Sequence, residues 1–480
     1  MNNQDRRVFW IGARTAELRE LRALGVNVVT VVHNAKRGEK SRDLGVESYN
    51  YFNVHSGNAA LSKHTLPLPE NMKNPLFFAA FDTFRRHYHR TSIVPYKILR
   101  SWVHLDNVFF LSAQFYYDIL LRNRVTTIIF SVVPHEGTFI ILYHLAKMMG
   151  LETIITLQTN FTERMWISRS IEDIGVFDSV QGEGLPLPTP DIPTVPFYMQ
   201  QSDKWKRLAI TMEKVVRESV KRVLNLLTLR PLWNPMGAQR NLVRLIHALD
   251  RFRVGVPSLG DVVEVDMDVP FIYFPLHLQP EMTTDTLGLL FGDQLRCLEA
   301  LSAAVPDDTL IYAKENPLQT TYMREESFFH RLRNLSNVRY VSTQVPSFEL
   351  ISKCRALATV TGTAGWEAAL MLKGVVCFGR AWFLPLPGVF AWEGPETLAK
   401  AMEFEGDRQS LEQAFDALSR KTYRGVVDYD YAAIVENFDA GKAARDVARS
   451  LVVAMLERPL PDHLDARTIS PDPPSPALPS

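Results

Sequence analysis

Three polar clusters in the second half of the chain have residue types that could bind a phosphorylated substrate. Each cluster directly follows a short apolar run that is typical of a buried strand. The clusters are HLQPE at 277–281, KENP at 314–317 and TGTAGWE at 361–367. Because the carboxyl ends of parallel strands open on one edge of a sheet, we expect the three loops to converge. Three polar loops on one edge are difficult to explain by folding alone, so they predict a ligand site.

The third cluster predicts a phosphate site at the start of a helix. A turn made by Thr361, Gly362, Thr363 and Ala364 would expose backbone N–H groups beside the positive end of the helix dipole. The two threonine hydroxyls add further donors, which suits a nucleotide phosphate. Glu367 follows one turn into the helix, where its carboxylate could accept hydrogen bonds from the two hydroxyls of a ribose. The alternative is an ordinary helix N-cap followed by an acidic residue in the first turn.

The other two clusters add charge and proton-transfer groups. Lys314 offers a positive charge to a phosphate or to the carboxylate of a sugar. His277 and Glu281 could transfer protons or recognise hydroxyls. A buried His277 that makes a structural hydrogen bond is the alternative.

A similar strand end occurs in the first half of the chain. The nearly pure apolar run 126–132 predicts a central strand that is buried on both faces, and His135 and Glu136 follow it directly. A helix-like stretch at 139–149 and an apolar run at 152–157 complete a βαβ unit. The position at a carboxyl strand end favours a functional role for both residues, and a structural hydrogen bond by His135 is the alternative.

Alternating apolar runs and helix-like stretches predict an α/β protein with two doubly wound, Rossmann-like domains. The first begins with a strand at 8–12, a helix at 16–24 and a strand at 26–32, whereas residues 35–105 show no clear period. The second domain begins near residue 269, with strands expected at 271–276, 309–313, 338–341, 356–360 and 375–378 and helices at 289–304, 325–335 and 366–372. The expected division is an N-terminal domain at 1–200, a helical segment at 201–260, a C-terminal domain at 261–400, further helices at 401–458 and a tail at 459–480.

Composition narrows the function classes. The 480 residues are too many for one ordinary core and suit two domains. Lys and Arg number 53, as do Asp and Glu, so no overall field attracts nucleic acid and no nucleic-acid partner is expected. The three cysteines lie far apart, which excludes a disulfide scaffold and a thiolate zinc site, and no metal site is expected. The N-terminal stretch MNNQDRRVFWIGART resembles no signal peptide, and no apolar run is long enough to cross a bilayer, so we expect a cytoplasmic protein.

The segment from Lys204 to Arg253 is locally basic. It holds twelve Lys and Arg residues against three acidic ones, and its apolar residues recur at helical spacing. The segment therefore predicts two basic amphipathic helices. Their charged face is either solvated or in contact with anionic lipid or a lipid-linked acceptor, which would make the protein peripheral at the inner membrane. The tail from Pro459 has seven prolines in 22 residues and is expected to be disordered.

The second half resembles the bacterial capsule polysaccharide biosynthesis family, which includes the retaining β-Kdo transferases. The resemblance rests on FPLHLQPE at 274–281, GDQL at 292–295, YAKENP at 312–317, SFELISKCRALATVTGTAGWEAAL at 347–370 and VVCFGRAWFLPLPGV at 375–389. The segment VVPHEGTFIILYHLAKMMG at 132–150 is similar to the N-terminal domain of the family.

The resemblance implies a GT-B-like glycosyltransferase that binds a nucleotide-sugar in the cleft between its domains. In the β-Kdo transferases the donor is CMP-Kdo, and the transfer needs neither metal nor cofactor. Gln279 and Pro280 match the family's QP motif. Lys314 and Glu315 match the start of its KEHP motif, in which Asn316 replaces the family's histidine. An asparagine can donate a hydrogen bond but cannot carry a charge.

The resemblance thus implies transfer of a Kdo-like sugar from a CMP-linked donor to a polysaccharide or lipid-linked acceptor. A retaining transferase can use a carboxylate nucleophile, and Glu136 is the candidate for that carboxylate or for a base. One alternative is another nucleotide-sugar enzyme such as an epimerase. The other is a non-catalytic nucleotide- or glycan-binding protein that assists capsule assembly or export.

Overall fold

We analysed a computed structural model of the chain. The structure describes residues 6–33, 45–55, 58–61, 66–90, 102–177, 182–189, 261–279, 281–316, 326–428 and 431–458, together with 217, 220, 224, 319 and 324. The expected basic helices, Pro280 and the proline-rich tail lie outside these described residues, apart from the three single positions in the basic segment.

The N-terminal domain is built on a seven-stranded sheet of order β14-β6-β5-β4-β1-β2-β3. Its five strands from β5 to β3 are parallel, and β6 and β14 extend it with antiparallel pairs. All four residues of β4 are buried, as the apolar run predicts. The strands are β1 (Arg7–Ala13), β2 (Asn27–His33), β3 (Glu47–Asn50), β4 (Thr127–Phe130), β5 (Glu152–Gln158), β6 (Arg164–Ser168) and β14 (Tyr423–Arg424).

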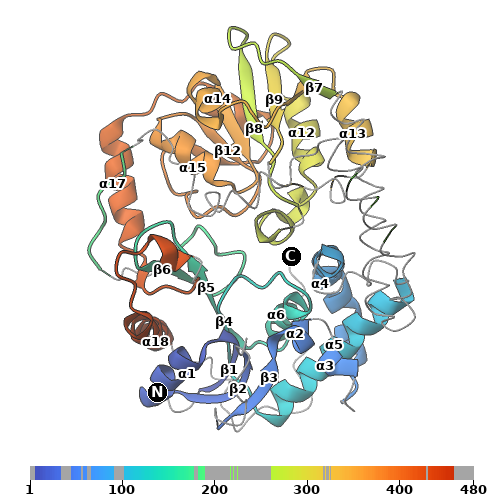
Figure 1. Cartoon of the computed structure of the whole chain (residues 1–480), viewed down its shortest axis with the longest axis vertical. Helices are drawn as coiled ribbons and strands as arrows, with labels where there is room; N and C mark the ends of the chain where they lie inside the picture. The colour runs from blue at the N-terminus through green and yellow to red at the C-terminus, as the bar shows by residue number, and fades with distance from the viewer. Residues whose placement is uncertain are drawn as a thin grey trace.

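Helices cover both faces of this sheet (Figure 1). Helices α4, α5 and α6 pack on one face, and α1 and α18 pack on the other. The helices of this domain are α1 (Thr15–Ala23), α2 (Tyr51–His55), α3 (Asn58–Leu61), α4 (Glu70–Arg90), α5 (Trp102–Arg122), α6 (Phe139–Met148) and α18 (Ala440–Glu457). Helix α4 falls in the region without a clear period, because Pro75 interrupts its first turns and Arg85 and Arg86 follow near its end.

The C-terminal domain has a second seven-stranded sheet, of order β13-β12-β11-β8-β9-β10-β7, and its strands are all parallel. Helices α12, α13 and α16 cover one face, whereas α14 and α15 cover the face toward the common core. The strands are β7 (Val262–Val263), β8 (Phe271–Pro275), β9 (Leu310–Lys314), β10 (Val338–Val341), β11 (Ala356–Thr359), β12 (Val375–Cys377) and β13 (Val389–Ala391). The helices are η7 (Met282–Thr286), η8 (Leu289–Phe291), α12 (Gln294–Ser302), α13 (Glu326–Arg333), α14 (Ser347–Lys353), α15 (Thr363–Leu370), α16 (Pro395–Met402) and α17 (Arg408–Ser419), and a short 3-10 turn, η10 (Tyr431–Ile434), follows β14.

The two doubly wound domains that the sequence predicts are therefore present. One expected helix, at 289–304, begins later than predicted. Asp293 caps α12 by accepting a hydrogen bond from the backbone N–H of Leu295, and the preceding residues form the short helices η7 and η8. Helix α15 begins at Thr363, three residues earlier than expected, directly after the glycine turn.

The end of the chain returns to the first domain. Helix α17 runs alongside both domains (Figure 1), β14 then joins the N-terminal sheet, and α18 packs beside α1. Residues 401–458 are thus shared between the domains, and the N-terminal core is completed by the last described helix.

The two domains share a continuous apolar core. Phe161 of the N-terminal domain contacts the rings of Trp366, Trp382 and Phe415, with ring centroids 5.2–6.3 Å apart. Gly175 adopts a φ of +92°, and a Cβ atom there would lie 2.5 Å from the carbonyl oxygen of Ala381, so glycine permits this close approach. Among the described residues, no helix is both long and apolar enough to span a bilayer.

Candidate functional site

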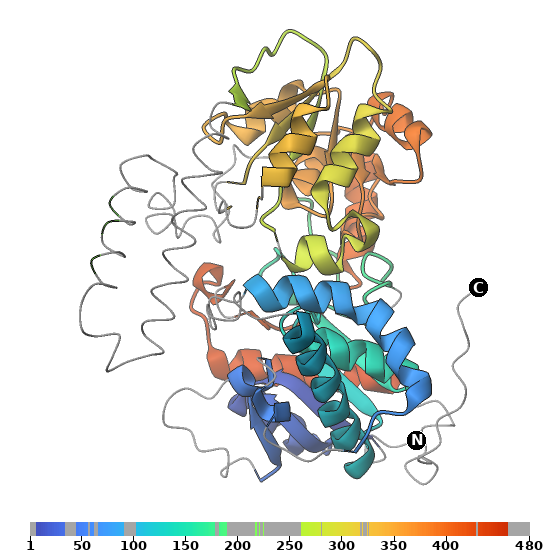
Figure 2. The same cartoon turned by 90° about the vertical axis from the view of Figure 1, so that its right-hand side faces the viewer.

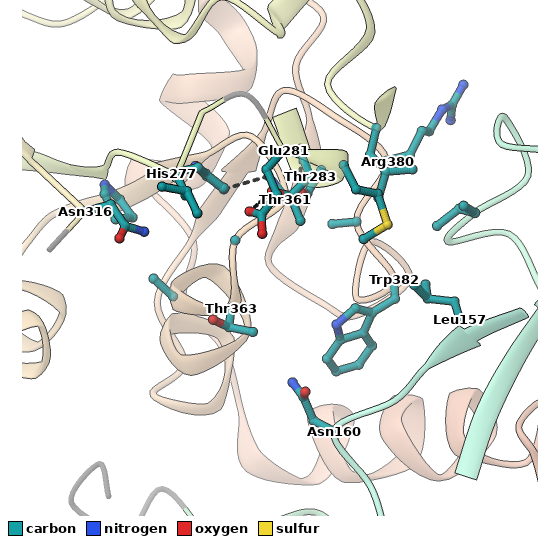
Figure 3. Close-up of a pocket in the computed structure, with 18 of the residues that line it drawn as sticks. Leu157, Asn160, His277, Glu281, Thr283, Asn316, Thr361, Thr363, Arg380 and Trp382 are labelled. Carbon is teal, nitrogen blue, oxygen red and sulfur yellow. Dashed lines mark hydrogen bonds between the residues drawn. The ribbon is translucent and has the colours of Figure 1, made fainter. Parts of the chain in front are cut away.

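A cavity of about 330 Å³ lies between the two domains, at the carboxyl edges of both sheets (Figure 3). Its walls are the loops after β8, β9, β11 and β12, the start of α15 and helix η7 from one domain, and the end of β5 with the loop after it from the other. The three polar clusters converge here as predicted, because each contributes lining residues. Volumes of this size are typical of small-molecule sites.

His277 and Thr361 are buried polar residues of the cavity wall, each with 8% of the residue exposed. The His277 ring contacts the turn that carries Thr361. Its Nε2 accepts a hydrogen bond of 3.3 Å from the backbone N–H of Thr361. The proton of the neutral ring is therefore on Nδ1, which is buried and has no hydrogen-bond partner among the described residues. Burial and, to a lesser extent, the nearby positive charge of Arg324 lower the pKa of His277 to about 4, so the ring is neutral at pH 7.

The neutral state of His277 changes its expected chemistry. A group with this pKa is a poor proton donor near neutrality, so the contact of Nε2 with the Thr361 N–H makes His277 a positioning group for the turn after β11. The turn that follows β11 is fitted closely around the ring, because a Cβ atom on Gly362 would lie 2.7 Å from His277 Nε2. Only glycine fits at position 362.

Helix α15 begins at the cavity. Gly362 is its N-cap, and Thr363 and Ala364 in its first turn line the cavity, which places the positive end of the helix dipole there. The hydroxyl of Thr361 donates to the carbonyl oxygen of Thr283 at 2.9 Å. Thr361 therefore ties the turn to η7, rather than offering its hydroxyl proton to a phosphate as expected.

Lys314 and Glu367 form a second polar cluster, behind the cavity wall. Lys314 Nζ donates to Ser347 Oγ at 2.8 Å, and the Tyr273 hydroxyl donates to the same oxygen at 3.3 Å. Burial lowers the pKa of Lys314 to about 8 and raises the pKa of Glu367 to about 7, although each charge partly stabilises the other. The Glu367 carboxylate accepts no hydrogen bond from any residue that the structure describes. Glu367 lies one turn beyond Thr363 on the same face of α15, so a ligand at the helix start could extend to it.

Gln279 and Glu315 do not line the cavity. Both are held by Arg324, whose side chain is 2% exposed and which the sequence analysis did not identify. The guanidinium donates to both Glu315 carboxylate oxygens at 3.0 and 3.2 Å, to Gln279 Oε1 at 2.9 Å and to the His277 carbonyl oxygen at 3.0 Å. Glu315 Oε1 also accepts from the backbone N–H of Asn316 at 2.7 Å, and Asn316 itself lines the cavity. Gln279 and Glu315 thus position the loops that carry His277 and Asn316.

Glu281 lines the cavity beside η7. Its carboxylate accepts a hydrogen bond of 2.9 Å from the Thr283 hydroxyl, and its backbone N–H donates to Asp285 Oδ2 at 2.9 Å. Asp285 is fully buried and pairs with Arg86 of α4 at 2.9 Å, so an N-terminal helix fixes this part of the wall. In Figure 2, α4 lies directly below η7.

His135 and Glu136 lie at the carboxyl end of β4, as expected, but they line a smaller neighbouring pocket. Glu136 accepts a hydrogen bond of 2.9 Å from the Tyr51 hydroxyl. His135 Nδ1 donates to the Val133 carbonyl at 2.6 Å, and its Nε2 lies 3.7 Å from Glu136 Oε1. The ring of His87 is 5.2 Å from that of His135, and His87 Nε2 is 3.9 Å from Asp285 Oδ2. Glu136 is therefore connected to the cavity wall through consecutive contacts.

Several cavity residues were not identified from the sequence, among them Asn160, Arg380 and Trp382. Arg380 and Trp382 follow β12, and Asn160 follows β5 of the other domain. All three lie beyond the carboxyl ends of expected strands, so the rule that found the other clusters could have found them.

Comparisons with known proteins identify one family. Residues 292–418 match the family described as "Capsule polysaccharide biosynthesis protein", which is roughly a quarter of the chain. No curated protein sequence matches the chain.

The solved structures with similarity are distant. The β-Kdo 2,7 transferase KpsC of Thermosulfurimonas dismutans is 12% identical, with a TM-score of 0.31 over 72% of this chain and 89% of that chain. The β-Kdo 2,4 transferase KpsC of the same organism is 11% identical, with a TM-score of 0.31 over 63% and 82%. A UDP-GlcNAc 2-epimerase of Methanocaldococcus jannaschii is 12% identical, with a TM-score of 0.25 over 93% and 99%. Similarity this low supports no argument about activity. The family match stands on its own, and it confirms that residues 292–418 carry the sequence signature of the capsule polysaccharide biosynthesis family.

Proposed function

We propose that this protein is a glycosyltransferase of capsule polysaccharide biosynthesis that binds a nucleotide-sugar in the cavity between its domains. The observation that carries the proposal is the start of α15, where Gly362, Thr363 and Ala364 line the cavity beside His277. An anionic phosphate would complete this arrangement, because it can accept from the backbone N–H groups of the helix start.

The neighbouring groups support a nucleotide rather than a free phosphate. A phosphate at Thr363 would place an attached ribose along the face of α15 that carries Glu367. The Glu367 carboxylate has no protein donor among the described residues, and two ribose hydroxyls would supply donors to it. Lys314 adds a positive charge on the same side. The family resemblance favours a CMP-linked, Kdo-like donor.

In the proposed reaction, the bond between the anomeric carbon and the phosphate oxygen breaks, and the nucleotide leaves with the bonding electrons. The helix dipole and Asn316 would stabilise the negative charge that develops on the leaving phosphate. For a retaining transfer, a carboxylate would attack the anomeric carbon, and the acceptor hydroxyl would then displace that carboxylate and pass its proton to it. Glu136, which the sequence suggests for this role, accepts from the Tyr51 hydroxyl in the neighbouring pocket and does not line the cavity, so it would serve only a sugar that reaches from the cavity into that pocket.

Further parts of the proposal rest on the resemblance and the sequence. The acceptor would be a glycan or a lipid-linked sugar bound by the N-terminal domain. A cytoplasmic location, metal independence and contact of residues 204–253 with anionic lipid remain predictions. Activity with and without a chelator tests metal independence. Vesicle binding that is equal for neutral and anionic lipid would contradict the lipid contact.

A thermal-shift panel of CMP, UDP, GDP and CDP and their sugar-linked forms tests the proposed function. Specific binding stabilises the folded protein by RT ln(1 + [L]/Kd), so the correct nucleotide should raise the Tm in proportion to its affinity. Glu367→Ala and Lys314→Ala should each weaken that binding roughly 10- to 150-fold, because charge-assisted hydrogen bonds are lost. Arg296→Ala is the control, because Arg296 is exposed and does not line the cavity, and its helix α12 packs on the opposite face of the sheet from α15. No stabilisation by any member of the panel would contradict the proposal.

A further inference from the structure

The cavity has two chemically different halves. The half at the start of α15 is polar, as described above. The other half carries mostly apolar and aromatic side chains, namely Leu157 and Ile174 from the N-terminal domain and Met282 and Trp382 from the C-terminal domain, together with Arg380. If the ribose of a donor runs from this phosphate along α15 toward Glu367, the sugar on the other side of the phosphate would lie in the second half.

Trp382 is fixed firmly in the wall of the second half. Its indole contacts the rings of Trp366, Phe383 and Phe161, with centroids 5.0, 5.4 and 5.6 Å away. These rings come from both domains and cover part of the indole, and the uncovered part borders the cavity. In Figure 3 the indole lies beside Asn160, between Thr363 on one side and Leu157 on the other. Because its neighbours hold the ring, ordering it on a ligand would cost little conformational entropy.

Polar groups beside the indole are available for hydrogen bonds. Asn160 is exposed at the cavity, and its carboxamide makes no hydrogen bond with any residue that the structure describes. The indole Nε1–H of Trp382 likewise has no acceptor in the described part of the chain. Gln158, the other amide of this wall, already donates to the Arg164 carbonyl at 2.9 Å and accepts from the Val427 N–H at 2.9 Å. Asn160 is thus the amide that a ligand can engage.

We propose that Trp382 and Asn160 form the subsite for the sugar ring of the donor. A pyranose has C–H groups on its faces and hydroxyls on its rim, and this pair offers an aromatic surface with a carboxamide beside it. The subsite is built from one residue of each domain, so it recognises the sugar only when the domains are together. The inference rests on the proposed function, because it takes the phosphate position as its starting point.

Titration calorimetry with CMP and with CMP-Kdo separates the sugar subsite from the nucleotide site. Trp382→Ala should weaken binding of CMP-Kdo about tenfold while changing binding of CMP less than about twofold, because stacking is lost only for the sugar. Asn160→Ala should act in the same direction with a smaller loss. Trp392→Ala is the matched control, since Trp392 stacks on Phe378 and does not line the cavity.

Equal losses for CMP and CMP-Kdo in the Trp382 and Asn160 variants, or no loss for either, would overturn the subsite. If Trp382→Ala does not fold, Asn160→Ala decides, because Asn160 is exposed and makes no described contact that folding needs. An unchanged ratio of CMP-Kdo to CMP affinity in that variant rejects the proposal. If the wild-type protein binds neither CMP nor CMP-Kdo, the proposed donor fails first and the subsite for its sugar fails with it.

Discussion

Burial sets the protonation of the three titratable residues around the start of α15. His277, Lys314 and Glu367 have pKa values of about 4, 8 and 7, and burial is the largest cause in each case. At pH 7.5 the ring is neutral, the lysine is mostly charged and the carboxyl is mostly ionised. Buried titratable groups with pKa values shifted in this way are enriched at functional sites.

Glu367→Gln should change the pH dependence of stability in a defined direction. Because folding raises the pKa of Glu367 from 4.5 to about 7, the folded state keeps a proton that the unfolded state loses between these values. Its contribution to the unfolding free energy is therefore fully present below pH 4.5 and is lost as the pH rises to 7. Relative to wild type, the glutamine variant should gain stability across this window, by at most about 3 kcal/mol.

Urea unfolding of the wild-type protein and of Glu367→Gln between pH 4.5 and 7 measures this difference in unfolding free energy. The two proteins share their other titratable groups, so most of the other pH-dependent contributions cancel in the comparison. The titration of Lys314 does not change the unfolding free energy with pH between 4.5 and 7. Its folded pKa of about 8 lies below its ordinary value, so its contribution is lost only as the pH falls from 10.5 to 8. A stability difference that does not vary with pH would mean that Glu367 is ionised at its ordinary pKa.

Asn316→His tests the departure from the family pattern. Asn316 lines the cavity, and a histidine there could carry positive charge next to the leaving phosphate. Turnover of CMP-Kdo should rise, with a smaller effect on its binding, and the increase could approach the roughly 10²- to 10⁴-fold typical of general acid–base groups. Steady-state kinetics measure the change in kcat and KM.

The other outcomes of Asn316→His identify alternatives. A loss of activity on a different nucleotide donor would mean that asparagine is adapted to that donor and that the CMP assignment is wrong. No turnover by either protein, with CMP still bound, would favour a non-catalytic binding protein.

At the scale of elements, α4 fixes the cavity wall from the opposite domain. Arg86 pairs with the buried Asp285, and the Thr83 hydroxyl donates to the Asp285 carbonyl at 3.2 Å. Asp285 in turn accepts the backbone N–H of Glu281, so α4 positions the start of η7. The geometry of this wall therefore depends on the contact between the domains.

Arg86→Gln should loosen η7 more than Arg85→Gln does. Arg86 bonds a buried carboxylate, whose loss of a partner costs roughly 2 kcal/mol. The neighbouring Arg85 pairs with Asp82, whose side chain is 60% exposed, and such pairs contribute at most about 1 kcal/mol. Hydrogen exchange of the amides in 282–287 should become faster in the Arg86 variant alone. Equal exchange in the two variants would show that α4 does not hold this wall.

The carboxyl strand ends could be predicted from the sequence because each depends on local signals only. An apolar run followed by polar residues marks 277–281 and 314–317, and a glycine turn in addition marks 361–367, without knowledge of the rest of the fold. The residues that the sequence analysis missed owe their roles to distant partners. Arg324 acts through Gln279 and Glu315, and Asp285 acts through Arg86, about 200 positions away. A single sequence gives no sign of such pairs.

At the scale of the whole molecule, the chain closes its first domain with its last described helix. Strand β14 is only two residues long, so no periodicity predicts it, and it joins β6 in the N-terminal sheet. Helix α18 has an amphipathic pattern, but the pattern does not say which domain its apolar face covers. The structure places that face on α1 and on the side of the sheet formed by Val8 and Trp10. The first 200 residues therefore do not contain the complete N-terminal core.

Leu451→Ala and Leu456→Ala test this closure on a single helix. Leu451 is 0% exposed and packs in the N-terminal core, whereas Leu456 is 59% exposed. Removing the buried side chain should cost about 2–5 kcal/mol, and removing the exposed one should change stability by less than about 0.5 kcal/mol.

Because the apolar core is continuous across both domains, both variants should unfold in one transition, with tryptophan fluorescence and far-UV circular dichroism giving the same midpoint in urea. Equal stabilities would mean that α18 does not complete the N-terminal core. Two separate transitions, with only the first shifted by Leu451→Ala, would mean that the domains fold independently and that the aromatic contacts around Phe161 do not couple them.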